Sequence, residues 1–138
     1  MKRIIAIDYG DARTGVAVSD LTGTLAGEAL TIQEWNAEKL AQRLAFFARE
    51  RDAEKFVLGL PKNMDGTEGP RAEKARQFKA LLEEASGLPV ILWDERRSTI
   101  EAHAILHAAG KKEKKHRANV DAVAATLLLE RYLASPNR

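Results

Sequence analysis

The feature of this sequence that most constrains its fold is a carboxylate at the end of each of two apolar runs. Asp8 directly follows the apolar residues 4–7, and Glu95 lies two positions after the apolar residues 90–93. A third acid, Asp121, stands at the start of an apolar segment with helical character. A carboxylate at the end of a buried strand is costly unless it is exposed in a cleft, paired or bound to a cation. The three acids therefore indicate one shared site.

The composition narrows the class of protein. A chain of 138 residues, 45% of them hydrophobic, can bury one core and has little length left for a second, so we expect a single domain over residues 1–138. The formal charge is only +2, so nucleic-acid binding has to be argued from where the cations lie. The absence of cysteine excludes disulfides, zinc–thiolate sites and a thiol nucleophile. No stretch approaches the roughly 20 apolar residues of a membrane span, and none resembles a signal-peptide core, so we expect a soluble, cytoplasmic protein.

Five apolar stretches predict β-strands. Turn residues at 9–13 and at Thr22-Gly23 separate the first three, which predicts an antiparallel meander. Pro61 stops the fourth stretch, whose short and continuously apolar character is typical of a central parallel strand. The predicted strands cover residues 3–7, 14–19, 26–32, 56–60 and 90–93.

Apolar residues at helical spacing predict four helices. Asn36 is suited to cap the first of them, and Gly87 and Gly110 end the second and third. The predicted helices cover residues 36–51, 72–85, 98 or 99 to 108, and 119–133.

The order of these elements predicts an α/β fold. Its mixed central sheet is antiparallel over the first three strands, parallel afterwards, and flanked by helices. This order is typical of the ribonuclease H-like fold, in which the first strand and the strand after the second helix lie near each other. Such a fold would bring Asp8 and Glu95 together, and the final helix would lay Asp121 across them.

A basic segment, residues 111–117, lies directly before the predicted last helix. It holds five Lys or Arg in seven residues, which suits displacement of counterions from nucleic acid. Such a run is more often a solvated loop, but its place beside a candidate catalytic acid favours a phosphate-binding edge. Arg13, Arg96 and Arg97 are expected near this edge, although Arg97 could equally be an ordinary surface residue. The cations of the segment are Lys111, Lys112, Lys114, Lys115 and Arg117.

Two further patterns are candidates for binding sites. The loop 61–70 carries Lys62 and backbone amides to the carboxyl edge of the sheet, where open α/β sheets bind ligands, although Asp65-Gly66 is also simply a tight turn. His103 and His107 have the i, i+4 spacing of a zinc pair, but no third ligand is evident, which argues against a metal role.

The chemistry of the three acids indicates phosphodiester hydrolysis. Carboxylates without cysteine suit Mg²⁺ or Mn²⁺ better than zinc, and two such ions roughly 4 Å apart can activate water and neutralise the leaving oxygen. The alternative is structural: Asp8 as a turn-capping aspartate and Asp121 as an acid favoured by the helix dipole.

Four short motifs follow one another along almost the whole chain. They are Asp8-Tyr9-Gly10 with Gly15-Val16-Ala17, Gly59-Leu60-Pro61 with Asn63-Met64-Asp65-Gly66, Asp94-Glu95-Arg96 with Ser98-Thr99, and Asp121-Ala122 with Ala124-Ala125. Together they resemble the YqgF/RuvX family of Holliday junction resolvases. The resemblance implies a ribonuclease H-like nuclease, implicated in maturing the 5′ end of precursor small-subunit ribosomal RNA and similar to the resolvase RuvC.

The resemblance also implies roles for single residues. Asp8, Glu95 and Asp121 match the catalytic positions, with Asp8 bridging two metal ions and each of the others completing one coordination shell. Glu95 is chosen over Asp94 on family grounds, because alternation along a strand lets only one of them face the site. The contacts to substrate that the resemblance favours in the loop 61–70 are Lys62, Asn63 and Thr67.

Two departures from the family pattern are visible. Where many members have a basic pair, this chain has Arg13-Thr14, which leaves Arg13 as the early phosphate contact. The related resolvase offers two neighbouring acids on its last helix, whereas the positions after Asp121 are Ala124 and Ala125. The second metal is then held loosely, or Asp94 contributes.

Other functions remain open at this level. A non-catalytic nucleic-acid-binding or regulatory protein could use the basic edge and keep the acids for structure. An actin-like or sugar-kinase-like ATP-binding domain shares this core, but such enzymes close two domains around the nucleotide. Branched DNA and folded precursor RNA would present phosphates to the site alike, and symmetric cutting of a junction would require a homodimer.

Overall fold

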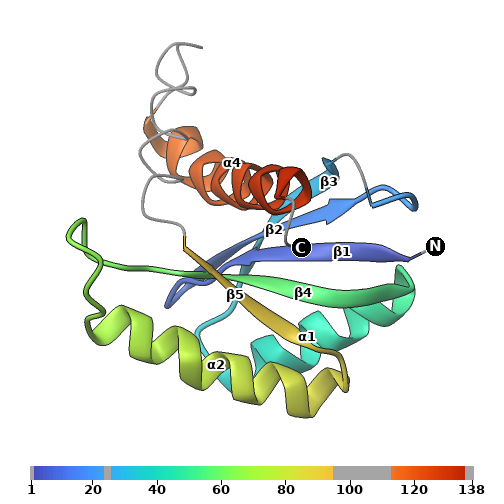
Figure 1. Ribbon diagram of the computed structural model, residues 1–138, viewed down its shortest axis with the longest axis horizontal. Coiled ribbons are helices and arrows are strands. Elements are labelled where there is room, and N and C mark those ends of the chain that lie inside the picture. The colour runs from blue at the N-terminus through green and yellow to red at the C-terminus, as the bar shows by residue number, and fades with distance from the viewer. Residues whose placement is uncertain (1, 24–25, 95–112, 136–138) are drawn as a thin grey trace.

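The computed structural model describes residues 2–23, 26–94 and 113–135, with side chains in the last range from Val120 onward. Figure 1 shows a twisted sheet with α1 and α2 on one face and α4 on the other. The strands are β1 (Arg3–Asp8), β2 (Arg13–Ser19), β3 (Ala26–Gln33), β4 (Ala53–Leu60) and β5 (Val90–Asp94). The helices are α1 (Ala37–Glu50), α2 (Pro70–Ser86) and α4 (Glu113–Ala134).

The strand order β3-β2-β1-β4-β5 confirms the predicted mixed sheet. β1, β2 and β3 pair antiparallel, and β1, β4 and β5 pair parallel. The parallel strands therefore end at one edge of the sheet, which we call the carboxyl edge. β2 begins and β3 ends at this same edge, because both run antiparallel to their neighbours in turn.

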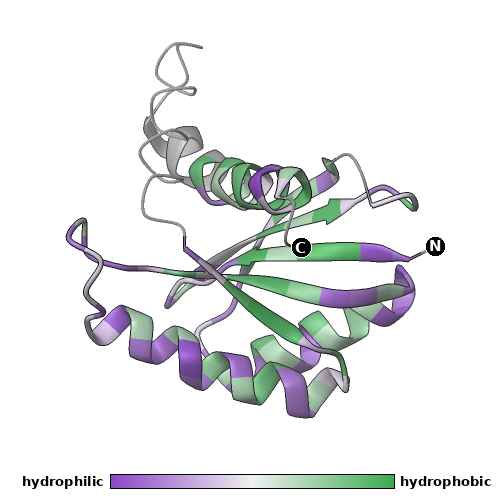
Figure 2. Ribbon diagram, viewed as in Figure 1, coloured by the Kyte–Doolittle hydropathy of each residue, from purple (hydrophilic) through white to green (hydrophobic). Residues whose placement is uncertain are grey.

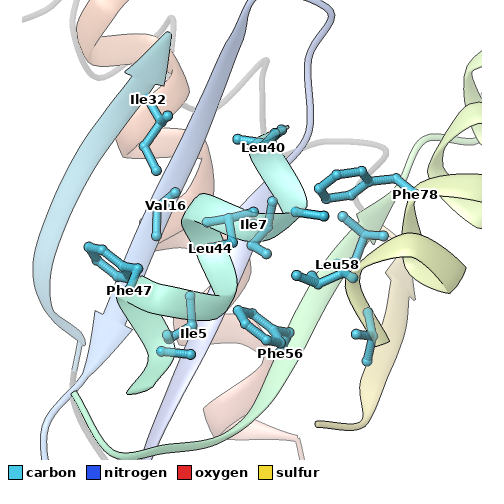
Figure 3. Packing of buried hydrophobic residues seen from close by; sticks show 14 of the residues in the cluster. Ile5, Ile7, Val16, Ile32, Leu40, Leu44, Phe47, Phe56, Leu58 and Phe78 are labelled. Atoms are coloured by element: carbon cyan, nitrogen blue, oxygen red, sulfur yellow. The ribbon is translucent and has the colours of Figure 1, made fainter. Parts of the chain in front are cut away.

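Side chains alternate between the two faces of the sheet, as the pleat requires. Ile5 and Ile7 point to the face covered by α1 and α2, where they pack with residues such as Leu44 and Phe56 (Figure 3). Ile4 and Ala6 point to the other face and pack against the apolar side of α4. Figure 2 shows the hydrophobic residues concentrated in the strands and in α4.

Several predicted element boundaries are confirmed and others move. Asn36 caps α1, its Oδ1 accepting a hydrogen bond from the Lys39 amide at 2.9 Å. α2 begins at Pro70 rather than at residue 72, because proline is well suited to the first helical position. Gly87 adopts the left-handed conformation, with φ 71°, that ends α2. The predicted third helix, 98 or 99 to 108, lies outside the described residues.

The predicted start of the last helix was wrong. α4 begins at Glu113, not near Asn119, so most of the basic segment 111–117 belongs to the helix rather than to a preceding loop. Lys, Arg and Glu are good helix formers, and no glycine or proline lies between Gly110 and the end of α4 at Ala134. Within the described ranges, no helix is long and apolar enough to cross a membrane.

The contribution of the Asn36 cap to stability can be tested by mutation. Asn36→Ala should lower the free energy of unfolding by about 1 kcal/mol, because an amide in the first turn of α1 loses its acceptor. Asn36→Asp, which keeps the acceptor, should retain most of the stability. Urea unfolding followed by circular dichroism measures both variants, and an unchanged stability of Asn36→Ala would show that the cap contributes nothing.

Candidate active site

The carboxyl edge gathers the ends of the strands that carry the candidate acids. Asp8 is the last residue of β1 and pairs in register with Gly15 of β2. Because Ile4 and Ala6 face α4, alternation directs Asp8 to the same face. Its neighbour Tyr9 points to the opposite face, where its ring stacks on Phe78 of α2 at 4.3 Å. Asp8 and Tyr9, which are neighbours in the chain, therefore point to opposite faces of the sheet.

Asp121 reaches this edge through a backbone contact between α4 and β2. A Cβ atom placed on Gly15 would overlap the main-chain carbonyl of Asp121, so the helix rests directly on the glycine. Gly15 is also the register partner of Asp8. The structure thus brings Asp8 and Asp121 to one place on the α4 face.

The carboxylate of Asp121 is largely buried, and Arg13 is its charged neighbour. Its side chain is 22% exposed, and within the described residues Oδ2 is buried without a hydrogen-bond partner. Arg13 Nε lies 3.6 Å from this oxygen, which makes an ion pair but is too long for a good hydrogen bond. Burial raises the pKa of Asp121 above its usual value, and the charge of Arg13 lowers it in part. Such an unsatisfied buried carboxylate oxygen fits a cation ligand, since a bound cation would satisfy it.

The packing of β5 argues against Asp94 as the third acid. Ile91 and Trp93 pack on the α4 side, where Trp93 contacts Tyr132 edge to face at 5.4 Å. Alternation therefore directs Asp94 to the face covered by α1 and α2, away from Asp8 and Asp121. This argues against the suggestion that Asp94 supports the metals and favours Glu95, which lies outside the described residues.

Much of the predicted phosphate-binding set also lies beyond the described part of the chain. Among the described residues, no group of three His, Cys, Asp or Glu side chains could hold a metal ion. The backbone of Lys114, Lys115 and Arg117 lies in the first turns of α4, ahead of Asp121 on the same helix. The candidate site residues that lie outside the described part of the chain are Glu95, Arg96, Arg97, His103, His107, Lys111 and Lys112.

The loop 61–70 is a compact turn held by its own polar groups. Asn63 Nδ2 donates to Thr67 Oγ1 at 2.8 Å, and Thr67 Oγ1 donates to Asp65 Oδ1 at 2.7 Å. Gly66 has φ 91°, the left-handed conformation of a tight turn. The hydrogen bond between Asn63 and Thr67 thus helps to hold the shape of the loop. The backbone of Lys62 forms an isolated β-bridge with Glu68, and its ammonium group is the positive charge of the loop.

The sequence reasoning missed an ion cluster in the turn between β1 and β2. Asp11 lies 3.3 Å from Lys74 Nζ and 3.9 Å from an Arg71 nitrogen, so it ties this turn to the start of α2. A small pocket at the same place is lined by Tyr9, Asp11, Gly59, Pro61, Arg71, Lys74 and Ala75. These residues lie far apart in the sequence, and no local pattern links residue 11 with α2, so the cluster could not be predicted.

Comparison with known proteins agrees with this geometry. Residues 2–135 match the family model described as RuvX, Holliday junction resolvase. The chain is 42% identical over 137 residues to a protein of Halothermothrix orenii named "Putative pre-16S rRNA nuclease", covering 99% of this chain and 97% of that one.

Two solved structures share the fold. The RuvC of Thermus thermophilus gives a TM-score of 0.57 at 14% identity, covering 95% of this chain and 93% of that one. The Fowlpox virus resolvase, solved with Holliday junction DNA, gives a TM-score of 0.57 at 14% identity, covering 95% and 96%. These similarities confirm the predicted ribonuclease H-like fold.

The close contact between Gly15 and the α4 backbone can be tested in the same way. Gly15→Ala should lower the free energy of unfolding by about 2–3 kcal/mol, because the added methyl group forces α4 away from β2. The matched control is Gly27→Ala on the neighbouring strand, where the nearest atom to an added Cβ is the Val18 carbonyl oxygen at 3.4 Å. Thermal unfolding of both variants tests this, and equal effects would mean that α4 does not rest on Gly15.

Proposed function

The chain belongs to the RuvX family of Holliday junction resolvases and is a nuclease, and we propose that it hydrolyses phosphodiester bonds of structured nucleic acid at the carboxyl edge of its sheet. The observation that carries this proposal is the convergence of Asp8 and Asp121 across Gly15, where one oxygen of Asp121 is buried without a hydrogen-bond partner among the described residues. A fold alone would not support it, since function depends on the site.

The substrate that we propose is a precursor of small-subunit ribosomal RNA. The name of the relative from Halothermothrix orenii supports this choice, and the extent of the match covers nearly all of both chains. A ribosomal RNA substrate implies a cytoplasmic protein. The second candidate is a Holliday junction, as bound by the Fowlpox virus resolvase, which would need two copies of the chain to cut symmetrically.

Asp8, Asp121 and Glu95 are the residues that would hold Mg²⁺ or Mn²⁺. The buried, unsatisfied oxygen of Asp121 and the all-oxygen donor set fit such hard cations. When bound, the metal would lower the pKa of a water molecule, so that loss of a proton makes it a nucleophile towards phosphorus, and would supply a positive charge for the leaving oxygen.

The remaining residues of the site bind and orient the nucleic acid. Arg13 holds the Asp121 carboxylate and, with its side chain 38% exposed, retains donors for a phosphate. Lys62 brings a cation from the loop 61–70. The other phosphate contacts proposed are Asn63, Arg96, Arg97, Lys111, Lys112, Lys114, Lys115 and Arg117.

A cleavage assay tests this function. End-labelled precursor ribosomal RNA leaders, single-stranded RNA and four-way DNA junctions would be incubated with the protein and Mg²⁺ or Mn²⁺. Asp8→Asn should reduce cleavage about 100-fold or more, because a ligand and its charge are lost from the site. The control is Asp52→Asn, which changes an exposed acid directly before β4, at the opposite edge of the sheet from Asp8.

The outcomes of this assay separate the alternatives. Metal-dependent cleavage that Asp8→Asn abolishes and Asp52→Asn preserves supports the proposal and ranks the substrates. Binding without cleavage by any variant would instead favour a non-catalytic nucleic-acid-binding protein. Stabilisation by ATP rather than by nucleic acid would favour the ATP-binding reading.

Asp121 makes a further prediction that a purely structural role would not produce. Asp121→Asn should abolish cleavage but leave the melting temperature unchanged or higher, because it removes a charge that is desolvated in the fold. The ion pair lost with Arg13 is partly exposed and contributes little. Differential scanning calorimetry beside the cleavage assay measures both effects. A marked fall in melting temperature would identify Asp121 as a structural acid.

A further inference from the structure

Trp35 is the most exposed large hydrophobic side chain among the described residues. Its exposed fraction is 82%, against 60% for Met64 and 57% for Phe46. It lies in the short turn between β3 and α1, outside both hydrophobic cores. An indole has a large flat apolar face, which a protein usually buries when folding alone decides its position.

The position of Trp35 is fixed by the backbone on both sides. The Glu34 amide donates to the Ala12 carbonyl at 2.9 Å, which ties this turn to the turn between β1 and β2. On the other side, Asn36 caps α1. Arg43 of α1 donates to the Gln33 carbonyl at 2.9 Å. The indole is therefore presented from a held backbone rather than from a loose loop, which lowers the entropic cost of using it to bind.

The same turn places Trp35 on the carboxyl edge, beside the candidate active site. Gln33 pairs in register with Arg13, whose side chain contacts Asp121. Asp8 pairs with Gly15, which in turn pairs with Thr31 of β3. Two strand spacings and four residues along the edge strand put Trp35 about 16 Å from Asp8.

Cations border the turn between β1 and β2 on its other side. Asp11 is the shared partner of Arg71 and Lys74, whose side chains remain 65% and 58% exposed. Glu34, the neighbour of Trp35 in the chain, is itself paired with Arg43 at 3.4 Å. The hydrogen bond from Glu34 to Ala12 joins the turn that carries the exposed indole to the turn that Arg71 and Lys74 border. An exposed aromatic face with cations on the adjoining turn is a combination by which proteins bind single-stranded nucleic acid.

We propose that Trp35 stacks on an unpaired nucleobase of the substrate, while Arg71 and Lys74 contact the adjoining phosphates. This inference rests on the proposed function and deepens it, because it assigns a single-stranded segment to the substrate. Bases inside a duplex are already stacked on their neighbours, whereas unpaired bases can be splayed onto an aromatic ring.

Tryptophan fluorescence tests the contact directly. The chain has two tryptophans, so Trp93→Phe leaves Trp35 as the single reporter, and Phe preserves the aromatic contact with Tyr132. This variant would be titrated, with EDTA present to prevent hydrolysis, with a single-stranded RNA oligonucleotide and with a blunt RNA duplex. The single strand should quench the emission strongly and the duplex only weakly.

Affinity measurements supply the matched variants. Trp35→Ala should weaken binding of the single strand about tenfold and leave binding of the duplex unchanged, whereas Trp35→Tyr should retain most of the affinity. Phe46→Ala is the control, because Phe46 is also an exposed aromatic but lies on α1 roughly 15 Å along the helix from Trp35. All variants would be compared by circular dichroism.

Several results would overturn the inference. Absence of quenching, or equal affinity of Trp35→Ala and the native chain for the single strand, would remove Trp35 from the nucleic-acid surface. Dissociation of an oligomer by Trp35→Ala in sedimentation experiments would show that a second copy of the chain covers the indole instead. Quenching by RNA in a protein that cleaves none of the substrates would sustain this inference while the proposed function fails, and cleavage without quenching would do the reverse.

Discussion

The contact between the α4 backbone and Gly15 is the constraint on which the rest of the structure depends. Small residues on both sides permit it: Ala17 follows on the same face of β2, and Ala124 and Ala125 of α4 are fully buried. A larger residue at the interface would raise the helix from the sheet and carry Asp121 with it. The two alanines, which stand where a related resolvase offers acids, are thus packing residues in this chain.

Periodicity predicted those parts of the fold in which one short segment determines its own structure. The five strands, the Asn36 cap and the αL glycine at residue 87 are of this kind. The start of α4 was missed because the basic segment 111–117 was interpreted as a phosphate-binding segment ahead of the helix, although its helix propensity is high. The direction in which Asp94 points depends on the packing of Trp93 against Tyr132, which no local pattern reveals.

The convergence of Asp8 and Asp121 was expected from the element order, but the electrostatic state of Asp121 was not. The sequence shows an acid near a helix start, whereas the structure buries one of its oxygens and, within the described part of the chain, pairs that oxygen with Arg13 at 3.6 Å. Local conflicts of this kind concentrate at functional sites, because selection keeps a group that folding alone would replace. Among the described residues, the Asp121 oxygen shares this lack of a hydrogen-bond partner with the buried Tyr132 hydroxyl alone, and only the Asp121 group carries a charge.

Asp8 and Asp121 lie near opposite ends of the chain, and this has a consequence for synthesis. β1 leaves the ribosome well before α4 does. Until α4 docks, Ile4, Ala6 and Val57 lack their cover and the two carboxylates are apart. A nascent chain that has not yet released α4 therefore holds no assembled site, and the two acids come together only when α4 packs on the sheet.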